Sequence, residues 1–119
     1  MRFVKFFIIS VSCFLTALSY GAEFKTPKEL VFITSDRCPF CQEWERDVGH
    51  IYDSTPYAQH ANLRRIDFTE IAFMLPKLRD AVVGTPTFLI FENGVEIGRI
   101  EGYQSSEMFF WALSEYIQP

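Results

Sequence analysis

The sequence has few of the residues that bind structural metals. Its 119 residues include three cysteines and two histidines. Structural zinc commonly takes four ligands from two spaced Cys or His pairs. His50 and His60 have no such spacing to each other or to a cysteine. The sequence therefore disfavours a structural metal, and both histidines are interpreted as surface or half-buried residues.

Basic charge is also scarce. Eleven Lys and Arg residues oppose fifteen Asp and Glu residues, for a net charge of −4. Arg64 and Arg65 are adjacent, and such a pair is typical of a solvated edge rather than a basic patch. Proteins that bind nucleic acid usually present a basic patch or stripe, so we expect no nucleic-acid partner.

A long hydrophobic run is missing as well. The apolar run from Phe6 to Leu18 has about 13 residues, whereas a membrane-spanning helix needs roughly 20. The alternative of a membrane anchor is therefore disfavoured. Arg2 and Lys5 precede the run and small residues follow it, which is the order found in a secretory signal peptide. We expect residues 1–21 to be a signal peptide cut after Gly21, with a cut after Ser19 as the second choice.

Removal of this peptide would also remove Cys13, Arg2 and Lys5, so the net charge of the exported chain would fall to −6. The residues before Cys13, "SVS", do not form a lipoprotein motif. Residues 22–119 are then expected to form one domain.

Hydrophobic periodicity predicts strands and helices in alternation. One helix face is formed by Trp44, Val48, Ile51 and Tyr52, and another by Phe109, Leu113, Tyr116 and Ile117. Asn93-Gly94 is a strong hairpin signal, and Pro76 should kink or split its helix. The predicted elements are strand 30–34, helix 39–53, strand 63–68, helix 70–82, two strands within 87–102, and a last helix capped by Ser105 or Ser106.

This order of elements predicts an α/β fold. The first half is a βαβ unit, whose two strands must be parallel. The second half is a hairpin followed by a helix. We therefore expect a single mixed four-stranded sheet with helices on both faces, and the sequence has no repeats or internal linkers.

Cys38 and Cys41 allow three interpretations: a structural staple, a metal clip or a reaction centre. A disulfide stabilises mainly by closing a loop in the unfolded chain, and a four-residue loop gives about 2 kcal/mol at most. A reaction centre fits better, because unpaired N–H groups and the helix dipole at a helix start favour a thiolate. Pro39 suits the first helical position, and Arg37 adds positive potential. Cys38 is therefore the expected attacking thiol, and Cys41, one turn further in, the resolving thiol.

The segments "RCPFC" (37–41) and "VGTPTFLIFENGVEIGRIEG" (83–102) make the chain resemble the thioredoxin family over about residues 30–117. The resemblance implies a thiol–disulfide oxidoreductase in which Thr85-Pro86 is cis and faces the dithiol. It also implies that the Thr85 backbone pairs with an extended substrate and that Gly102 lies on the substrate groove. An ordinary trans proline and a turn glycine are the alternatives.

The chain also departs from typical thioredoxins. Phe32 stands where they carry a buried Asp, and Leu63 replaces the lysine that accompanies it, which predicts a dry, apolar floor beneath the cysteines. The Pro39-Phe40 dipeptide is closer to glutaredoxins. The eight residues "AEFKTPKE" leave little room for the family's first strand and helix, so the fold should be trimmed. The chain most resembles small exported thioredoxins, such as the one in bacterial sulfur-oxidation gene clusters.

These observations predict an exported, periplasmic oxidoreductase that reduces disulfides of other exported proteins. The family implies a membrane electron donor that re-reduces the dithiol. No bound cofactor is expected, because the cysteine pair carries the electrons. The rival hypothesis is a non-catalytic module that keeps the fold and holds a partner protein or Cu(I), which soft thiolates suit.

Overall fold

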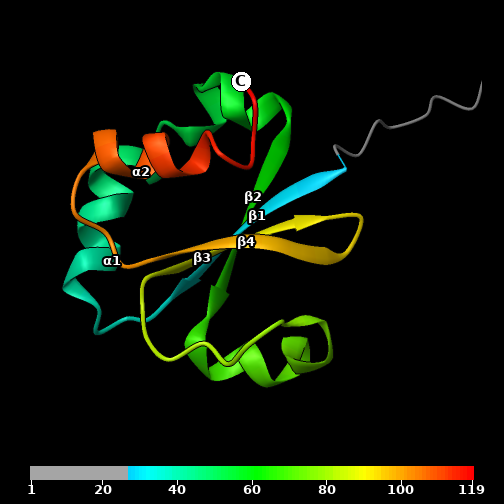
Figure 1. Ribbon diagram of the computed structural model, residues 1–119. Coiled ribbons are helices and arrows are strands. Elements are labelled where there is room, and N and C mark those ends of the chain that lie inside the picture. The colour runs from blue at the N-terminus through cyan, green and yellow to red at the C-terminus, as the bar shows by residue number, and fades with distance from the viewer. Residues whose placement is uncertain (1–26) are drawn as a thin grey trace, which may run out of the picture.

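The computed structural model describes residues 27–119, which contain one four-stranded sheet. The strands are β1 (Lys28–Thr34), β2 (Ala61–Asp67), β3 (Thr87–Glu92) and β4 (Val95–Glu101), in the order β2-β1-β3-β4 (Figure 1). β1 and β2 are parallel, whereas the β1–β3 and β3–β4 pairs are antiparallel. The predicted signal peptide, its cleavage site and Cys13 lie outside the described residues.

The ends of two strands differ from the predicted ones. β1 begins at Lys28 rather than Leu30, and β2 runs from Ala61 to Asp67 rather than from Leu63 to Phe68. All seven residues of β1 pair with β2, from Lys28 opposite Ala61 to Thr34 opposite Asp67. Backbone pairing thus extends both strands beyond the apolar residues that predicted them.

The single helix predicted for residues 39–53 is wrong. The chain forms α1 (Pro39–Trp44), a π-helical turn η1 (Glu45–Gly49) and a short 3₁₀ turn η2 (Tyr52–Ser54), with η3 (Pro56–Gln59) following. Trp44, Val48 and Tyr52 are buried as expected, but Ile51 is 43% exposed. The backbone turns at residues 50–51, where the π-helical turn ends, so Ile51 leaves the buried face.

The helix predicted for residues 70–82 is also different. A 3₁₀ helix, η4 (Phe68–Lys77), occupies its first part, and residues 78–83 form no helix. It ends one residue after Pro76, which has no N–H to continue a helix. Asp67 supports its start, because its Oδ1 accepts hydrogen bonds from the N–H (2.9 Å) and the hydroxyl (2.7 Å) of Thr69.

The hairpin and the last helix match the prediction. Asn93 and Gly94 have φ values of 52° and 80°, as a two-residue hairpin turn of the Asn-Gly type requires. α2 (Ser106–Leu113) begins at the predicted cap Ser105, whose Oγ accepts a hydrogen bond from Met108 N at 3.2 Å.

The helices lie on both faces of the sheet, as predicted. α1 and α2 cover one face and η4 covers the other (Figure 1). The α1–α2 side buries a large aromatic cluster that includes Phe32, Trp44, Phe88 and Phe109. Across residues 27–119, no helix reaches the length and apolar character that crossing a membrane requires.

Candidate active site

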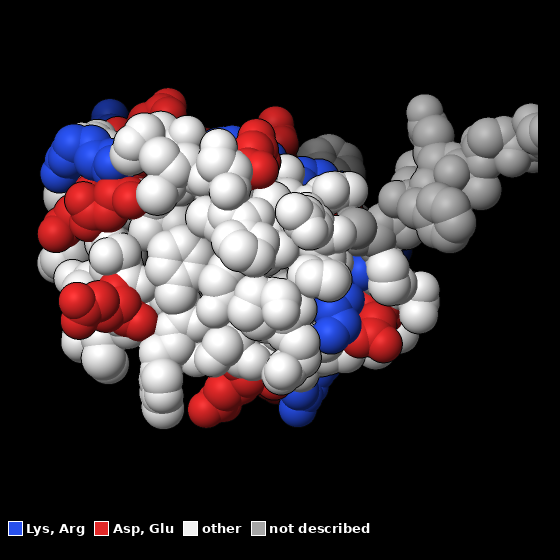
Figure 2. Space-filling model, turned by 90° about the horizontal axis from the view of Figure 1, so that it is seen from above, with Lys and Arg blue, Asp and Glu red and all other residues white. Residues whose placement is uncertain are grey.

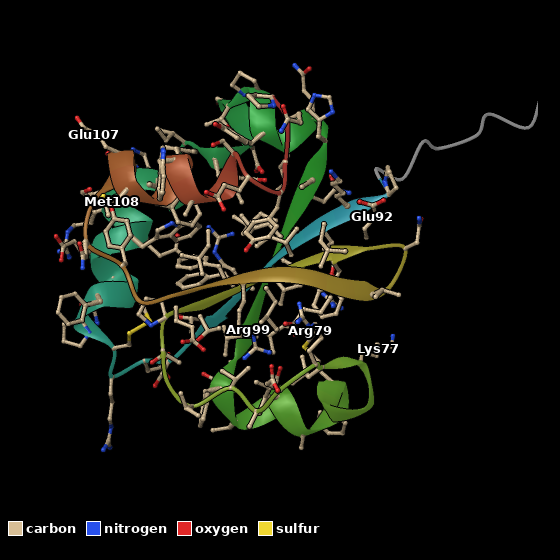
Figure 3. The ribbon with its side chains drawn as sticks, in the orientation of Figure 1. Lys77, Arg79, Glu92, Arg99, Glu107 and Met108 are labelled. Carbon is tan, nitrogen blue, oxygen red and sulfur yellow. A yellow bond between two sulfur atoms is a disulfide. The ribbon has the colours of Figure 1, made fainter. Side chains whose placement is uncertain are left out.

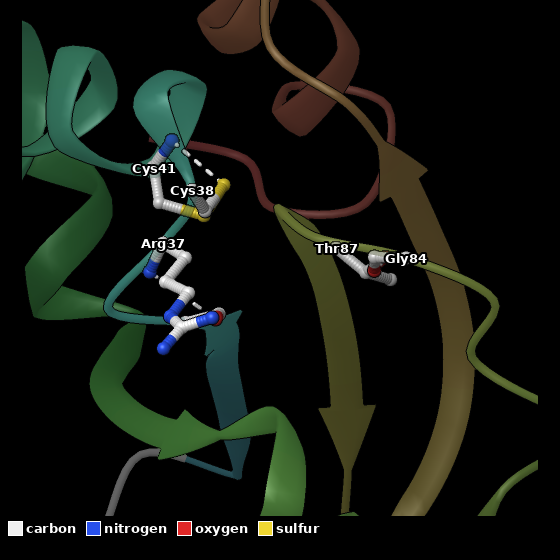
Figure 4. The surroundings of a disulfide bond; sticks show 6 residues. Arg37, Cys38, Cys41, Gly84 and Thr87 are labelled. Atoms are coloured by element: carbon white, nitrogen blue, oxygen red, sulfur yellow. Dashed lines mark hydrogen bonds between the residues drawn. A yellow bond between two sulfur atoms is a disulfide. The ribbon is translucent and has the colours of Figure 1, made fainter.

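The two cysteines form a disulfide at the start of α1 (Figure 4). Cys38 is the N-cap with extended backbone angles (φ −106°, ψ 101°), and Pro39 is the first helical residue. The Cα atoms of Cys38 and Cys41 are 5.2 Å apart, and Cys41 N donates a hydrogen bond to Cys38 Sγ at 3.1 Å. The backbone N–H of the first turn thus points at the Cys38 sulfur, as a thiolate there would require.

The two sulfurs differ in access. Cys38 is 6% exposed and Cys41 is 1% exposed, while Arg37, Pro39 and Phe40 around them are exposed. Cys38 is therefore the less buried of the two cysteines. Arg37 directly precedes Cys38 in the chain.

The loop before β3 meets the end of β4 beside the disulfide. The Thr85-Pro86 peptide bond is cis, as the family resemblance implied. Gly102 N donates a hydrogen bond to Pro86 O at 2.8 Å, and the Thr87 hydroxyl donates to Gly84 O at 2.7 Å (Figure 4). Gly102 has φ +80°, and a Cβ there would have no atom within 4 Å. Backbone conformation, rather than crowding, therefore favours glycine at this position.

A groove of about 460 Å³ brings together Thr85, Pro86 and Gly102, the residues predicted to line a substrate groove. Phe40, which was predicted to support the active site, also lines it. Sequence reasoning missed the remaining wall, which comes from the end of β4, the following loop and α2. The additional lining residues are Ile100, Glu101, Tyr103, Gln104, Met108, Phe109, Trp111 and Ala112. One signal was available, because Met108 and Trp111 are apolar residues outside the predicted buried face of the helix.

The floor beneath the cysteines is aromatic. Phe32 is fully buried, with its ring stacked on Phe88 (4.9 Å between centroids) and tilted against Trp44 (4.5 Å). Leu63, at the other position where typical thioredoxins carry a charge, is half-buried against the same cluster. Neither position supplies a carboxylate or an amine to the buried side of Cys41.

A tyrosine and a carboxylate do meet at the edge of this cluster. The buried Tyr103 donates its hydroxyl to Asp47 Oδ2 at 2.7 Å. Burial raises the pKa of Tyr103 well above its usual value, and the hydrogen bond and charge of Asp47 and the charge of Glu43 raise it further. Tyr103 therefore stays a neutral hydrogen-bond donor at physiological pH.

Both histidines lie on the surface, which agrees with their interpretation from the sequence. His50 and His60 are exposed, and the His50 ring nitrogen Nδ1 lies 3.2 Å from Glu45 O. In the part of the chain that the structure describes, no three His, Cys, Asp or Glu side chains gather in a group able to hold a metal ion.

Comparisons with known proteins agree with this geometry. A family model described as a thioredoxin-like domain matches residues 22–117. The periplasmic thioredoxin SoxS from Paracoccus pantotrophus, solved in its reduced form, is 26% identical and superposes with a TM-score of 0.64, covering 74% of this chain and 93% of that one. A thioredoxin mutant from Halobacterium salinarum shares the fold at 23% identity and a TM-score of 0.61, over 79% of this chain and 78% of that one. A disulfide bond formation protein from Brevibacillus choshinensis is 25% identical over 88 residues, 74% of this chain and 72% of that protein.

Proposed function

Because the chain belongs to the thioredoxin-like domain family and is a thiol–disulfide oxidoreductase, we propose that it is exported and reduces disulfides of other exported proteins. The observation that carries the proposal is the position of the Cys38–Cys41 disulfide. It lies at a helix start, beside a groove that Thr85, Pro86 and Gly102 line.

The proposed reaction is a two-step exchange that starts from the reduced dithiol. The Cys38 thiolate attacks one substrate sulfur, which forms a mixed disulfide and releases the other substrate sulfur as a thiolate that takes up a proton. Cys41 loses its proton and attacks Cys38 Sγ, which frees the second substrate thiol and restores the Cys38–Cys41 disulfide. Two electrons pass from the dithiol to the substrate.

The surrounding residues have distinct proposed roles. Arg37 and the first-turn N–H groups stabilise the Cys38 thiolate, and Pro39 starts the helix. Phe40 covers the approach to the sulfurs. The backbone of Thr85 pairs with the extended substrate chain, while Pro86 and Gly102 shape the groove in which that chain lies.

Two observations support export. Residues 1–21 have the charged, apolar and small-residue order of a signal peptide, which leaves residues 22–119 as the exported domain. One similar structure is named a periplasmic thioredoxin, and one similar protein is named for disulfide bond formation. In an oxidising compartment the dithiol needs a source of electrons, and we assign this role to a membrane electron-transfer protein.

The direction of electron flow follows from how strongly the reduced form is stabilised. Pro39 and Phe40 offer no side-chain hydrogen-bond donor to the Cys38 thiolate, so its stabilisation should be moderate. We expect a reduction potential between those of thioredoxin and the glutaredoxins, about −270 to −200 mV. Such a dithiol gives electrons to more oxidising disulfides rather than installing new ones.

The experiment that tests the proposal is trapping in cells of the native host. Cys41→Ser should accumulate mixed disulfides with exported proteins, because the resolving thiol is missing, whereas Cys38→Ser should trap nothing. Non-reducing gels show both outcomes, and the reverse pattern would overturn the assignment of the two thiols.

Titration of the disulfide against glutathione measures the reduction potential and so tests the direction of electron flow. A potential near −120 mV, that of the strong oxidant DsbA, would make the protein an oxidase. N-terminal sequencing checks export, and molecules that retain Met1 would contradict it.

A further inference from the structure

One hydrogen bond joins the segment that carries the dithiol to the segment that forms most of the groove. The first segment runs from Cys38, the N-cap of α1, through the π-helical turn η1. The second, residues 95–113, comprises β4, the following loop and α2. Tyr103 belongs to the second segment, and its hydroxyl donates to Oδ2 of Asp47 on η1 at 2.7 Å. Among the described residues, no other hydrogen bond links residues 38–49 to residues 95–113.

The position of Tyr103 extends this connection to the cis-proline loop. Tyr103 lines the groove and directly follows Gly102, whose N–H donates to Pro86 O at 2.8 Å. Hydrogen bonds at two consecutive residues therefore connect Pro86 on one side to Asp47 on the other. The cis-proline loop lies at one end of this connection, and the helix that starts at Cys38 lies at the other.

Burial makes the bond costly to leave unmade. Tyr103 is 6% exposed and belongs to the same buried cluster as both cysteines. A buried hydroxyl that loses its partner is destabilising, and a bond to a carboxylate is stronger than a bond to a neutral acceptor. Asp47 is exposed and does not line the groove, so its effect on a bound substrate passes through Tyr103.

Contact between aromatic rings also joins the two segments. Trp44 of α1 packs edge-on against Phe109 of α2, with ring centroids 5.5 Å apart. Seen from the α2 side, the surface has a broad uncharged area, and charged side chains lie mostly around its margin (Figure 2). Apolar burial is not directional, whereas a hydrogen bond fixes the distance and direction between two atoms. The bond between Tyr103 and Asp47 therefore defines the relative position of the two segments more closely than ring contact alone.

We propose that Tyr103 is a positioning residue, which through Asp47 holds the helix of the dithiol at the distance from the cis-proline loop that an extended substrate requires. A substrate segment that pairs with Thr85 presents its disulfide to Cys38 only where the loop and the helix keep one spacing. A misplacement of reacting groups by about 1 Å can slow a reaction by roughly 100-fold. A small disulfide that does not contact the loop needs no such spacing. The inference rests on the proposed function, because it concerns the same reaction.

Two substrates separate positioning from reactivity. Insulin presents disulfides in protein segments, and its reduction is followed with dithiothreitol as the source of electrons and with the uncatalysed rate subtracted. The small aromatic disulfide dithiobis-nitrobenzoate reports the reactivity of the Cys38 thiolate, through the coloured thiolate that it releases. Tyr103→Phe should lower kcat/KM for insulin by about tenfold. The rate with the small disulfide should stay within about twofold, because the thiolate character of Cys38 sets it.

Changes at Asp47 test the route of the effect. Asp47→Ala should lower kcat/KM for insulin as Tyr103→Phe does. The double variant should be no slower than Asp47→Ala alone, because both changes break the same bond. Asp47→Asn keeps an acceptor oxygen for the hydroxyl and should therefore retain more activity than Asp47→Ala.

Tyr52 supplies the matched control. Its hydroxyl also donates a 2.7 Å hydrogen bond within the same cluster, to Ala61 O, but Tyr52 does not line the groove. Tyr52→Phe should lower stability, as Tyr103→Phe does, and should leave kcat/KM for insulin unchanged. Thermal unfolding of both variants measures the loss of stability.

The outcomes separate the inference from the proposed function. Equal losses of insulin reduction in Tyr52→Phe and Tyr103→Phe, or no loss in Tyr103→Phe, would overturn the inference and leave the proposed function standing. The inference would also be wrong if Tyr103→Phe slowed both substrates alike. Full activity in Asp47→Ala would overturn it as well, because the Tyr103 hydroxyl would then act on the substrate directly. Native protein that fails to reduce insulin would contradict both the inference and the proposed function.

Discussion

On the face of the sheet that α1 and α2 cover, fourteen buried residues form one cluster, whereas the η4 face has five. The first cluster includes both cysteines and a run of aromatic rings in mutual contact. The second is small and aliphatic except for Phe91, and Phe73 on η4 is 88% exposed. The Cys38–Cys41 disulfide thus packs against the face of the sheet that has the larger buried cluster.

On the η4 face, which has less buried apolar area, an ion pair and its hydrogen bonds hold the chain against the sheet. Arg99 projects from β4 toward this side (Figure 3), where it pairs with Glu96 and donates to Asp80 O and Ala81 O. Arg79 N also donates to Glu96 Oε1, at 3.3 Å. The pair therefore anchors residues 79–81, which lead into the Thr85-Pro86 loop. The comparison indicates that packing of aromatic rings holds the α1 side of the active site in place. On the other face, the Glu96–Arg99 ion pair holds the segment that leads into the Thr85-Pro86 loop.

The largest effect is expected at the centre of the aromatic cluster. Trp44 is fully buried against Phe32, Phe88 and Phe109. Trp44→Ala should lower the free energy of unfolding by about 3–5 kcal/mol, because it leaves a large cavity. Urea denaturation measures this.

Two further substitutions sharpen that test. Trp111→Ala is the control, because this tryptophan is 67% exposed and its loss should change stability by about 0.5 kcal/mol or less. Trp44→Phe should cost less than Trp44→Ala, since it keeps a ring and removes an indole N–H that is buried without a partner among the described residues. Equal losses at Trp44 and Trp111 would contradict the packing comparison.

The next effect is expected at the ion pair of the other face. Arg99→Met should lower the free energy of unfolding by about 2–3 kcal/mol, because it leaves the Glu96 carboxylate buried and unpaired. Combining it with Glu96→Leu should recover most of this loss, because no unpaired charge remains. A double-mutant cycle by urea denaturation measures the coupling, and additive losses would argue against it.

A smaller effect is expected where the aromatic cluster meets solvent. Tyr103→Phe removes the hydrogen bond to Asp47 and should cost about 1–2 kcal/mol at neutral pH. The raised pKa of Tyr103 means that folding favours the neutral phenol. Its contribution is complete below the ordinary tyrosine pKa of about 10 and is lost as pH rises above it. The variant should therefore lose less stability than the native protein between neutral and alkaline pH, as thermal unfolding would show; a steeper alkaline loss would contradict this.

The sequence predicted several local features of the active-site half of the molecule, although the single helix expected for residues 39–53 is broken there. Spacing and capping rules identified Cys38, Pro39 and Ser105, and the Asn93-Gly94 signal identified the hairpin. The resemblance supplied Pro86 and Gly102. The spacing, capping and hairpin features depend on neighbours within a few residues, so a local pattern can reveal them.

What the sequence did not reveal depends on contacts between distant residues. Glu96 and Arg99 are three apart, a spacing that puts residues on opposite faces of a regular strand. An irregular register opposite Ile90 and Phe91 brings both to the η4 side.

The smallest effect is expected at the start of η4. The hydroxyl and then the backbone N–H of Thr69 donate to Asp67 and lower the pKa of this carboxyl. Thr69→Val removes the hydroxyl bond and should bring the pKa of Asp67 closer to its ordinary value, with the backbone bond still lowering it. A carboxyl with a lowered pKa adds stability above the ordinary pKa of about 3.9 and loses it as pH falls through the folded-state value. The variant should therefore lose slightly less stability on acidification, and NMR titration of Asp67 measures the shift. Thr55→Val, on the α1 side, removes a hydroxyl bond to Tyr52 O and should leave the pKa of Asp67 unchanged; a shift there would mean that the two faces are coupled rather than built separately.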